Sequence, residues 1–372
     1  MIRRECTPRT NWREAVESLG CNFHTIDGAP YWDESACYEF TADQIDMLES
    51  ATAEIERICR EAVLHVVREK RAKDIGIPEA FIPYVMNSYD ARETSIYGRF
   101  DLVFDGKDHP KLLEYNADTP TALLEASVVQ WHWMKDRAAD ADQFNSIHEK
   151  LIAAWKKTGI RSMHFSCIRD HDEDLGNTEY IRDTAAQAGI ETKHVFVEDI
   201  GWDSRQKKFI DKDGAVIQTM FKLYPWEWLF ADSFGPHIAE SGVRFIEPAW
   251  KLMLSNKGIL PILWELFPGH PNLLPAYFDN RFSDNYVRKP FLSREGSNVS
   301  IVRNGTVQEK GGTYGAEGYI YQEHMPVPSF DGNYTTIGSW VIGGEPAGIG
   351  IREDTTEITM NSSRFIPHYF KE

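Results

Sequence analysis

Apolar positions in residues 41–70 recur with a period close to 3.6, which predicts a long amphipathic helix. The series runs from Ile45 to Val66. Thr41 and Gln44 stand before it with the spacing of a capping box, in which each residue bonds the backbone of the other. The pattern therefore predicts a helix that begins just after Thr41.

Strict alternation replaces this pattern in residues 97–116 and predicts two strands. Asp105 and Gly106 are common hairpin-turn residues and are expected to join them. The pattern then becomes helical again. Thr119 followed by Pro120 predicts an N-cap and a first helical position ahead of an apolar series.

From residue 143 onward, helical and strand patterns alternate. Helices are expected at 143–158 and 177–188, strands at 161–168, 192–197 and 243–246, helix stops at Gly159 and Gly189, and a hairpin at Asp213-Gly214. Strands that alternate with helices of this length are typical of a parallel α/β layer.

The last third of the chain is rich in glycine and β-formers. After a helix expected at 256–267, turns are expected at Asn304-Gly305, Asp331-Gly332 and Gly343-Gly344, which makes 285–350 antiparallel. An α/β piece between two antiparallel pieces favours a nucleotide-handling α+β enzyme over a binding module.

Composition narrows the class of protein. The 372 residues include 57 acidic and 40 basic ones, a net charge of −17 that disfavours nucleic acid and anionic membranes as partners. That charge suits a cationic small substrate, and it equally suits ordinary solubility. At roughly 150 residues per domain, the length predicts two or three domains or one large domain with a lid.

The cysteines and the N-terminus indicate a compartment. Five scattered cysteines with no Cys-x-x-Cys pair argue against a disulfide framework and a zinc site, and favour a reducing compartment. No apolar stretch resembles a signal peptide or a membrane span. We therefore expect a soluble cytoplasmic protein.

The most informative residues lie on the predicted hairpin. Residues two apart on a strand share a face, so Arg99 pairs with Asp101 and Glu114 with Asn116. If the strands pair, oxygen ligands suited to Mg²⁺ gather beside an arginine that can clamp a transferred phosphoryl group. An exposed hairpin with ordinary cross-strand ion pairs is the alternative. The helix predicted after Thr119 would also offer free N–H groups to an anion. The alternative is that Thr119 is an ordinary N-cap residue.

Two lysines and a later strand suggest a nucleotide site. Lys257 and Lys289 can reach phosphates, with a Gly/Ser turn after the second, although surface lysines would show the same spacing. The strand 318–324 ends in polar groups that can meet an adenine edge. An ordinary half-buried strand with a polar end would show the same pattern. Neither Gly-x-x-x-x-Gly-Lys-[Ser/Thr] nor Gly-x-Gly-x-x-Gly is present.

Several segments, taken in order, resemble the synthetase domain of glutathionylspermidine synthase and its stand-alone bacterial relatives over nearly the whole chain. They are Tyr97-Gly-Arg99-Phe-Asp101-Leu, Leu112-Leu-Glu114-Tyr-Asn116-Ala-Asp-Thr-Pro-Thr, Asn256-Lys257-Gly-Ile-Leu-Pro, Val287-Arg-Lys289-Pro and Tyr321-Gln322-Glu. The resemblance implies an ATP-grasp fold of α+β and α/β type, circularly permuted as in eukaryotic glutathione synthetase, with a pre-ATP-grasp-like α/β layer. It makes 1–372 one catalytic unit: N-terminal helices and a Mg²⁺-binding hairpin in 1–142, a substrate layer in 143–246, and an ATP-binding lid and C-terminal part in 247–372.

The same resemblance implies roles for individual residues. Arg99 would be catalytic and would contact ATP, and Asp101, Glu114 and Asn116 would hold two Mg²⁺ ions. Lys257 and Lys289 would bind the ATP phosphates beneath a flap at Glu295-Gly296-Ser297, and Gln322 and Glu323 would contact the adenine. The substrates would contact Thr119, Asp172, Glu173 and Lys222. Gly-rich stretches at 293–298 and 311–318 would form the lid.

The expected function is an ADP-forming carboxylate–amine ligase that uses ATP and Mg²⁺ and makes an amide through an acyl phosphate. Glutathione or another peptide acid with a polyamine would be its substrates. No segment corresponds to the amidase domain of the bifunctional enzymes, so no amidase activity is expected. The alternatives are a non-catalytic nucleotide- or polyamine-binding protein with this fold, against which Arg99 argues, and a kinase that releases the acyl phosphate. The sequence gives neither the oligomeric state nor a general base.

Overall fold

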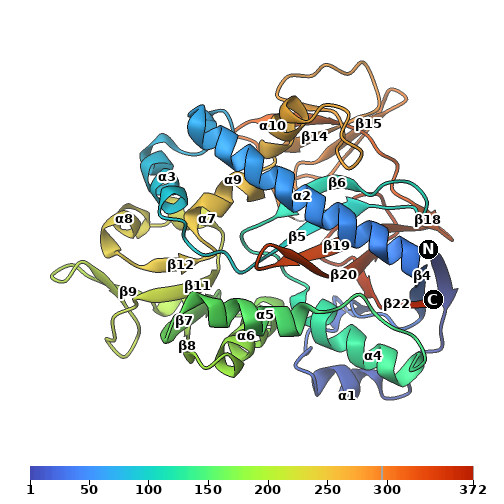
Figure 1. Ribbon diagram of the computed structural model, residues 1–372, viewed down its shortest axis with the longest axis horizontal. Helices are drawn as coiled ribbons and strands as arrows, with labels where there is room; N and C mark the ends of the chain where they lie inside the picture. Colours follow the sequence, from blue (N-terminus) through green and yellow to red (C-terminus); the bar gives the residue numbers. More distant parts are fainter. Residues whose placement is uncertain (295, 372) are drawn as a thin grey trace.

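The computed structural model describes residues 1–294 and 296–371 and is organised around a six-stranded antiparallel sheet (Figure 1). Its strands are β5 (Tyr97–Val103), β6 (Lys111–Asn116), β18 (Ser329–Phe330), β19 (Asn333–Ile342), β20 (Glu345–Asp354) and β21 (Arg364–Ile366). The order is β21-β20-β19-β5-β6, with β18 paired to β19. The expected first and last parts of the chain thus share one sheet.

The predicted hairpin of β5 and β6 is present, but its connection is longer than a two-residue turn. Residues 104–110 form a loop in which the Asp105 carboxylate accepts hydrogen bonds from the N–H groups of Lys107 (2.8 Å) and Asp108 (2.9 Å). An aspartate that accepts hydrogen bonds from backbone N–H groups two and three residues ahead stabilises a turn without hydrogen bonds between paired strands.

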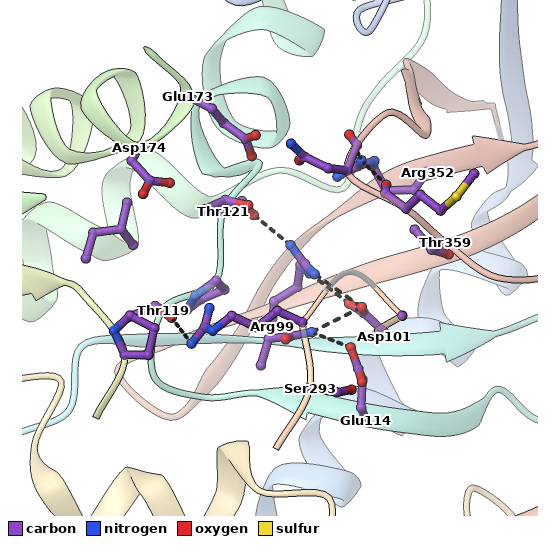
Figure 2. Close-up of a pocket in the computed structure, with 18 of the residues that line it drawn as sticks. Arg99, Asp101, Glu114, Thr119, Thr121, Glu173, Asp174, Ser293, Arg352 and Thr359 are labelled. Atoms are coloured by element: carbon purple, nitrogen blue, oxygen red, sulfur yellow. Dashed lines mark hydrogen bonds and ion pairs between the residues drawn. The ribbon is translucent and has the colours of Figure 1, made fainter. Parts of the chain in front are cut away.

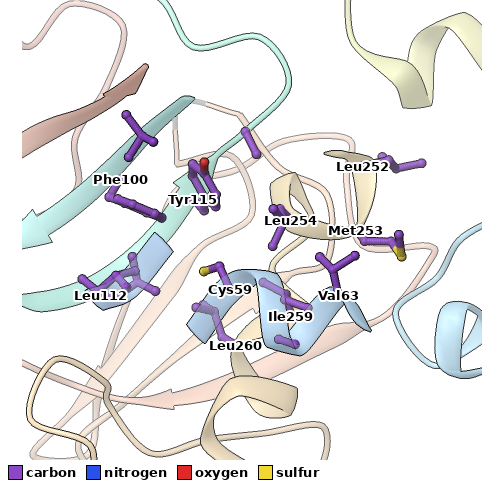
Figure 3. Close-up of a cluster of buried hydrophobic side chains, with 14 of the residues drawn as sticks. Cys59, Val63, Phe100, Leu112, Tyr115, Leu252, Met253, Leu254, Ile259 and Leu260 are labelled. Carbon is purple, nitrogen blue, oxygen red and sulfur yellow. The ribbon is translucent and has the colours of Figure 1, made fainter. Parts of the chain in front are cut away.

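Helix α2 (Ala42–Arg68) crosses one face of this sheet (Figure 1). Both bonds of the predicted capping box between Thr41 and Gln44 are present. The buried face of α2 packs with side chains of the hairpin and of two short helices, α9 (Leu252–Ser255) and α10 (Ile259–Leu266). Figure 3 shows this cluster, to which Cys59 and Val63 of α2 and Phe100 and Tyr115 of the hairpin all contribute side chains. The core therefore fixes the back of β5 and β6.

The predicted parallel α/β layer is confirmed as a four-stranded sheet in the order β12-β11-β7-β8. Its elements are α5 (Ile147–Thr158), β7 (Ser162–Cys167), α6 (Asp172–Gln187), β8 (Glu191–Phe196), β11 (Thr219–Leu223) and β12 (Arg244–Ile246). Helix α6 begins five residues earlier than expected, and β11 was not predicted. Near the expected turn at Asp213-Gly214, β10 (Lys208–Ile210) pairs with β9 (Gly201–Asp203) and bridges Val216.

The region 285–350 is antiparallel as predicted, but it is divided between two sheets. Its first half joins a five-stranded sheet made of β13 (Ala276–Tyr277), β14 (Tyr286–Pro290), β15 (Ser300–Arg303), β16 (Thr306–Glu309) and β17 (Tyr319–Glu323). Its second half supplies β19 and β20. Asn304 and Gly305 form the two-residue turn between β15 and β16, with φ of 52° and 70°, as tight hairpins require.

The two ends of the chain meet in a separate three-stranded sheet of β1 (Ile2–Glu5), β4 (Ala36–Thr41) and β22 (His368–Lys371) (Figure 1). In the part of the chain that the structure describes, the remaining elements are α1 (Trp12–Glu17), β2 (Thr25–Ile26), β3 (Ala29–Pro30), α3 (Ile82–Asp90), α4 (Gln130–Arg137), α7 (Trp226–Ala231), α8 (Ile238–Ser241), the π-helix η3 (Glu125–Val129) and five short 3₁₀ turns. Within the described residues, no helix is both long enough and apolar enough to cross a membrane.

The predicted helix start at Thr119 is wrong. Residues 117–122 form a loop, Ala122 has a positive φ of 66°, and helical structure begins at Leu123. The Leu123 N–H donates to Asn177 Oδ1 of α6 at 2.8 Å, so a distant residue caps this helix. Thr119 therefore offers no helix N-terminus to an anion.

Candidate active site

The hairpin presents its polar residues on the face opposite the core. Arg99 pairs in register with Asn116, and Asp101 with Glu114, so these four side chains share one face. The alternating residues, such as Phe100, point the other way and are buried beneath α2. Alternation along two paired strands is thus what gathers the four predicted residues (Figure 2).

A network of hydrogen bonds and ion pairs joins this face. Arg99 binds Asp101 with two nitrogens, Nε to Oδ1 at 2.7 Å and Nη2 to Oδ2 at 3.2 Å, and Nη1 donates to the Thr121 carbonyl at 2.7 Å. Asn116 Nδ2 donates to Asp101 at 3.1 Å and to Glu114 at 3.2 Å. The guanidinium is therefore held in a fixed orientation.

Lysine charges set the electrostatics of the neighbouring carboxylate. Lys257 Nζ lies 2.8 Å from Glu114 Oε2 and also donates to the Ser293 carbonyl at 3.1 Å. Burial alone would raise the pKa of Glu114, but the charges of Lys257 and Lys289 outweigh it and lower that pKa to about 2. Burial raises the pKa of Asp101. Glu114 is thus held as a carboxylate next to two ammonium groups.

The donors on this face suit a hard cation. No group of three or more His, Cys, Asp or Glu side chains able to hold a metal occurs in the part of the chain that the structure describes. The set here is two carboxylates, Asp101 and Glu114, with the amide oxygen of Asn116. Such a partial oxygen shell fits Mg²⁺, which keeps waters and completes its octahedron with substrate phosphates.

A polar cavity of about 280 Å³ opens over this face (Figure 2). Arg99, Asp101, Glu114 and Asn116 line it together with residues from the α/β layer, the predicted flap and β20: Thr119, His171, Glu173, Asp174, Trp228, Ser293, Arg294 and Arg352 among them. Both arginines and carboxylates therefore face the same space.

A second, more apolar cavity of about 110 Å³ adjoins the first between the two antiparallel sheets. Its walls include Leu113, Val287, Val299, Ile301, Met325, Val327 and Ile358, with Lys257, Lys289, Gln322 and Glu323 as polar lining. Lys289 Nζ donates to Gln322 Oε1 at 2.7 Å and to the Leu113 carbonyl at 2.9 Å. Asp101, Glu114, Gly296 and Thr359 line both cavities, so the two spaces meet at the carboxylates.

The predicted substrate residues lie in different settings. Thr119 and Glu173 line the polar cavity, and Thr119 accepts a hydrogen bond from Arg294 Nη2 at 2.8 Å. Asp172 is exposed and does not line it. Lys222 is buried in an ion pair with Asp118 at 2.6 Å and does not line it either. Glu295 lies outside the described residues.

The predicted lid is built from two segments that contact each other. The Asn298 N–H donates to the Lys310 carbonyl at 2.8 Å, and the Tyr314 N–H donates to Asn298 Oδ1 at 2.9 Å. The Leu292 N–H donates to Glu317 Oε1 at 3.0 Å. Residues of 292–298 are thereby tied to residues of 310–317, although the hairpin of β15 and β16 separates them in the chain.

Sequence reasoning missed Arg352 and Glu125. Arg352, on β20, donates to the carbonyls of Ser363, Met360 and Asn361 at 2.9–3.0 Å and faces the polar cavity. Glu125 is fully buried, accepts a hydrogen bond from the Tyr31 hydroxyl at 2.6 Å, and has a pKa raised to about 7 by burial and by Glu173, which lines that cavity. No local pattern marks either residue, because long-range packing creates both settings.

Gly338 of β19 leaves room for Arg99. A Cβ atom at this position would lie 2.8 Å from Arg99 Cδ. We expect Gly338→Ala to displace the guanidinium and to lower the kcat of the ATP-dependent reaction proposed below at least about tenfold, with a small change in Tm. Steady-state kinetics and thermal melting check this. Gly201→Ala, whose Cβ would come no closer than 3.3 Å to its nearest neighbour, the Ile210 side chain, is the matched control.

The fold is similar to that of a glutathione synthetase-like protein of known structure. A glutathione synthetase-like effector from Globodera pallida has a TM-score of 0.57 to this chain, at 11% sequence identity and with 98% of each chain covered. This likeness shows the fold, which is of mixed α/β content.

The family follows from the sequence comparison. The family model described as "Glutathionylspermidine synthase preATP-grasp" matches residues 3–371, so the chain belongs to the glutathionylspermidine synthase family. It is 42% identical over 367 residues to a Haemophilus influenzae protein named "Putative acid--amine ligase", covering 94% of this chain and 93% of the relative. These matches confirm the resemblance inferred from the motifs.

Two longer relatives match over part of their length. Trypanothione synthetase of Crithidia fasciculata is 31% identical over 340 residues, 82% of this chain and 52% of the relative. The bifunctional glutathionylspermidine synthetase/amidase of Escherichia coli is 27% identical over 365 residues, 89% of this chain and 58% of the relative. The chain thus spans little more than half the length of these two relatives.

Proposed function

We propose that this protein is an ADP-forming carboxylate–amine ligase with a circularly permuted ATP-grasp fold, which joins an acid to an amine through an acyl phosphate. The observation that carries the proposal is the junction of the two cavities. Asp101 and Glu114 line both spaces, and the guanidinium of Arg99 lies beside them. The names of the matched relatives, a ligase and two synthetases, support the same reaction type.

The apolar cavity is the proposed ATP site. Its aliphatic walls suit adenine, and Gln322 and Glu323 add polar groups to the lining that could meet the base edge. Lys257 and Lys289 are 6% and 7% exposed, and the charges of both act on Glu114, where the phosphates would meet the metal. Asp101, Glu114 and Asn116 would hold Mg²⁺, which would neutralise phosphate charge during the transfer. The lid over this site would keep water from the acyl phosphate.

The polar cavity is the proposed site of the acid and the amine. Arg352 and Arg294 supply positive charge for carboxylates of a peptide acid. Glu173 and Asp174, at the start of α6, supply negative charge for the ammonium groups of a polyamine. Arg99 would hold the phosphoryl group as it moves from ATP to the acid. An amine then displaces phosphate, which leaves with one oxygen of the acid.

Oxygen transfer tests this mechanism directly. With an acid labelled by ¹⁸O in its carboxylate, ligation through an acyl phosphate must place one labelled oxygen in the inorganic phosphate. Mass spectrometry of the phosphate reads the result. Unlabelled phosphate alongside amide formation would exclude the acyl phosphate, and labelled AMP in place of labelled phosphate would point to an acyl adenylate.

The pKa of Lys289 predicts how ATP binding depends on pH. Burial lowers this pKa to about 8, so the ammonium of the free protein loses its proton as the pH rises through that value. Phosphate binds the charged form, so ATP affinity should fall above pH 8 with proton uptake on binding. Calorimetry in two buffers of different ionisation enthalpy measures both effects. Lys289→Arg should abolish the fall, and a fall of equal size in that variant would contradict this assignment.

A further inference from the structure

Two cysteines meet where the N-terminal strand β1 runs beside β4. Arg4 pairs in register with Cys37, and the Cys6 N–H donates to the Ser35 carbonyl at 2.8 Å. Cys6 lies two residues beyond Arg4, so it faces the same side of the sheet as Cys37 at a diagonal position. The two Sγ atoms are 3.1 Å apart. The register of the sheet therefore puts two thiols in contact.

The two thiols have different environments. Cys6 is partly exposed, whereas Cys37 is 2% exposed. The hydrogen bond from Cys37 lowers the pKa of Cys6 to about 7 against the effect of burial, and the charges of Arg137 and Arg3 act in the same direction. The contact with Cys6 and burial raise the pKa of Cys37. Cys6 thus has the character of an attacking thiolate, and Cys37 that of a resolving thiol.

The other cysteines lack this character. Cys21, Cys59 and Cys167 are buried, and burial raises the pKa of each thiol. A low-molecular-weight oxidant that needs an accessible thiolate should therefore distinguish one pair among five cysteines.

We propose that Cys6 and Cys37 are a reversible redox modification site that low-molecular-weight disulfides such as glutathione disulfide oxidise. The Cys6 thiolate attacks one sulfur of glutathione disulfide, which forms a mixed disulfide and releases one glutathione thiolate. Cys37 then gives up its proton and attacks the Cys6 sulfur, which forms the intramolecular disulfide and releases the second glutathione. The protein loses two electrons and two protons, and one glutathione disulfide becomes two glutathione molecules.

The link would fasten the start of the chain to β4, next to an ion pair that joins β1 to the sheet that carries the site. Arg3 of β1 binds the buried Glu353 of β20 through Nε at 2.9 Å and Nη2 at 3.1 Å. Glu353 directly follows Arg352, which faces the polar cavity. A disulfide from β1 to β4 also restricts the unfolded chain, so the oxidised protein should melt at a higher temperature.

Thiol counting and peptide mapping test the proposal on the full chain. After incubation with glutathione disulfide and then denaturation, the wild type should have lost two of its five titratable thiols and should carry no glutathione. Peptide mapping should show Cys6 joined to Cys37, and dithiothreitol should restore both thiols. Cys37→Ala should stop at a glutathione adduct on Cys6, and Cys6→Ser should keep all its remaining thiols.

Two results would overturn the proposal. One is a wild-type protein that keeps all five thiols, and the other is a wild-type protein that accumulates a stable glutathione adduct without the internal disulfide. Circular dichroism before oxidation confirms that each variant is folded. Because Cys6 is at a partly exposed position, Cys6→Ser decides the question even if Cys37→Ala does not fold.

Discussion

Replacing Arg99 with alanine is expected to lower kcat about 10³-fold, or about 4 kcal/mol of transition-state stabilisation, while Mg²⁺·ATP still binds. The reason is its position: Arg99 lines the polar cavity and is fixed by the Thr121 carbonyl and by Asp101, which lines both cavities. A group there contacts the phosphoryl group in transit more than ATP at rest. Kinetics of phosphate release and calorimetry with Mg²⁺·ATP separate the two effects.

The controls for Arg99→Ala separate catalysis from folding. Arg57→Ala removes an exposed arginine of α2 whose partners lie on the same helix, and it should leave kcat unchanged. Added guanidinium ion should partly restore the activity of Arg99→Ala if the vacated position is filled. A variant with near wild-type turnover would remove Arg99 from the reaction, and a loss of Mg²⁺·ATP binding equal to the loss of kcat would make its role structural.

Replacing Glu114 with glutamine is expected to weaken Mg²⁺·ATP binding about 100-fold, or about 3 kcal/mol. Glu114 is a proposed metal ligand and also the charge partner of Lys257 at 2.8 Å. Without the Glu114 carboxylate, the positive charges of Lys257 and Lys289 are less well balanced. The Mg²⁺ ion would also lose one of its carboxylate ligands. Calorimetry with ATP in Mg²⁺ and in EDTA should show a large loss only when Mg²⁺ is present.

A matched glutamate controls this experiment. Glu309→Gln alters an exposed strand residue of β16 whose partner is Arg288, and it should leave both binding constants unchanged. If Glu114→Gln weakens ATP binding equally in EDTA, Glu114 acts by organising the lysines. If ATP binds the variant as tightly as the wild type in Mg²⁺, the metal is held elsewhere.

Local patterns were enough to predict the polar face of the hairpin. Alternation placed Arg99 with Asp101 and Glu114 with Asn116, and one register brought the two pairs together. The capping box at Thr41 and the turn at Asn304-Gly305 were also predictable, because their geometry depends on neighbours within a few residues.

Local patterns failed at positions that are set by contacts between residues far apart in the sequence. Thr119 had the local form of an N-cap, but Asn177 caps the helix at Leu123, and Asp118 before it is bound by Lys222. Arg352 lies on a strand whose pattern says nothing of the cavity it faces. Arrangements of this kind depend on how sheets meet, which no single segment of the sequence records.

The most direct measurement of the central claim is phosphate release from ATP with Mg²⁺ across a matrix of acids and amines. The acids should include glutathione and other peptides, the amines should include spermidine, and mass spectrometry should identify the products. We expect ADP, phosphate and an amide in equal amounts, only when an acid and an amine are both present. Phosphate release with an acid alone at the same rate would make the protein a kinase. Tight Mg²⁺·ATP binding without turnover for any pair would contradict the ligase and favour a nucleotide-binding protein.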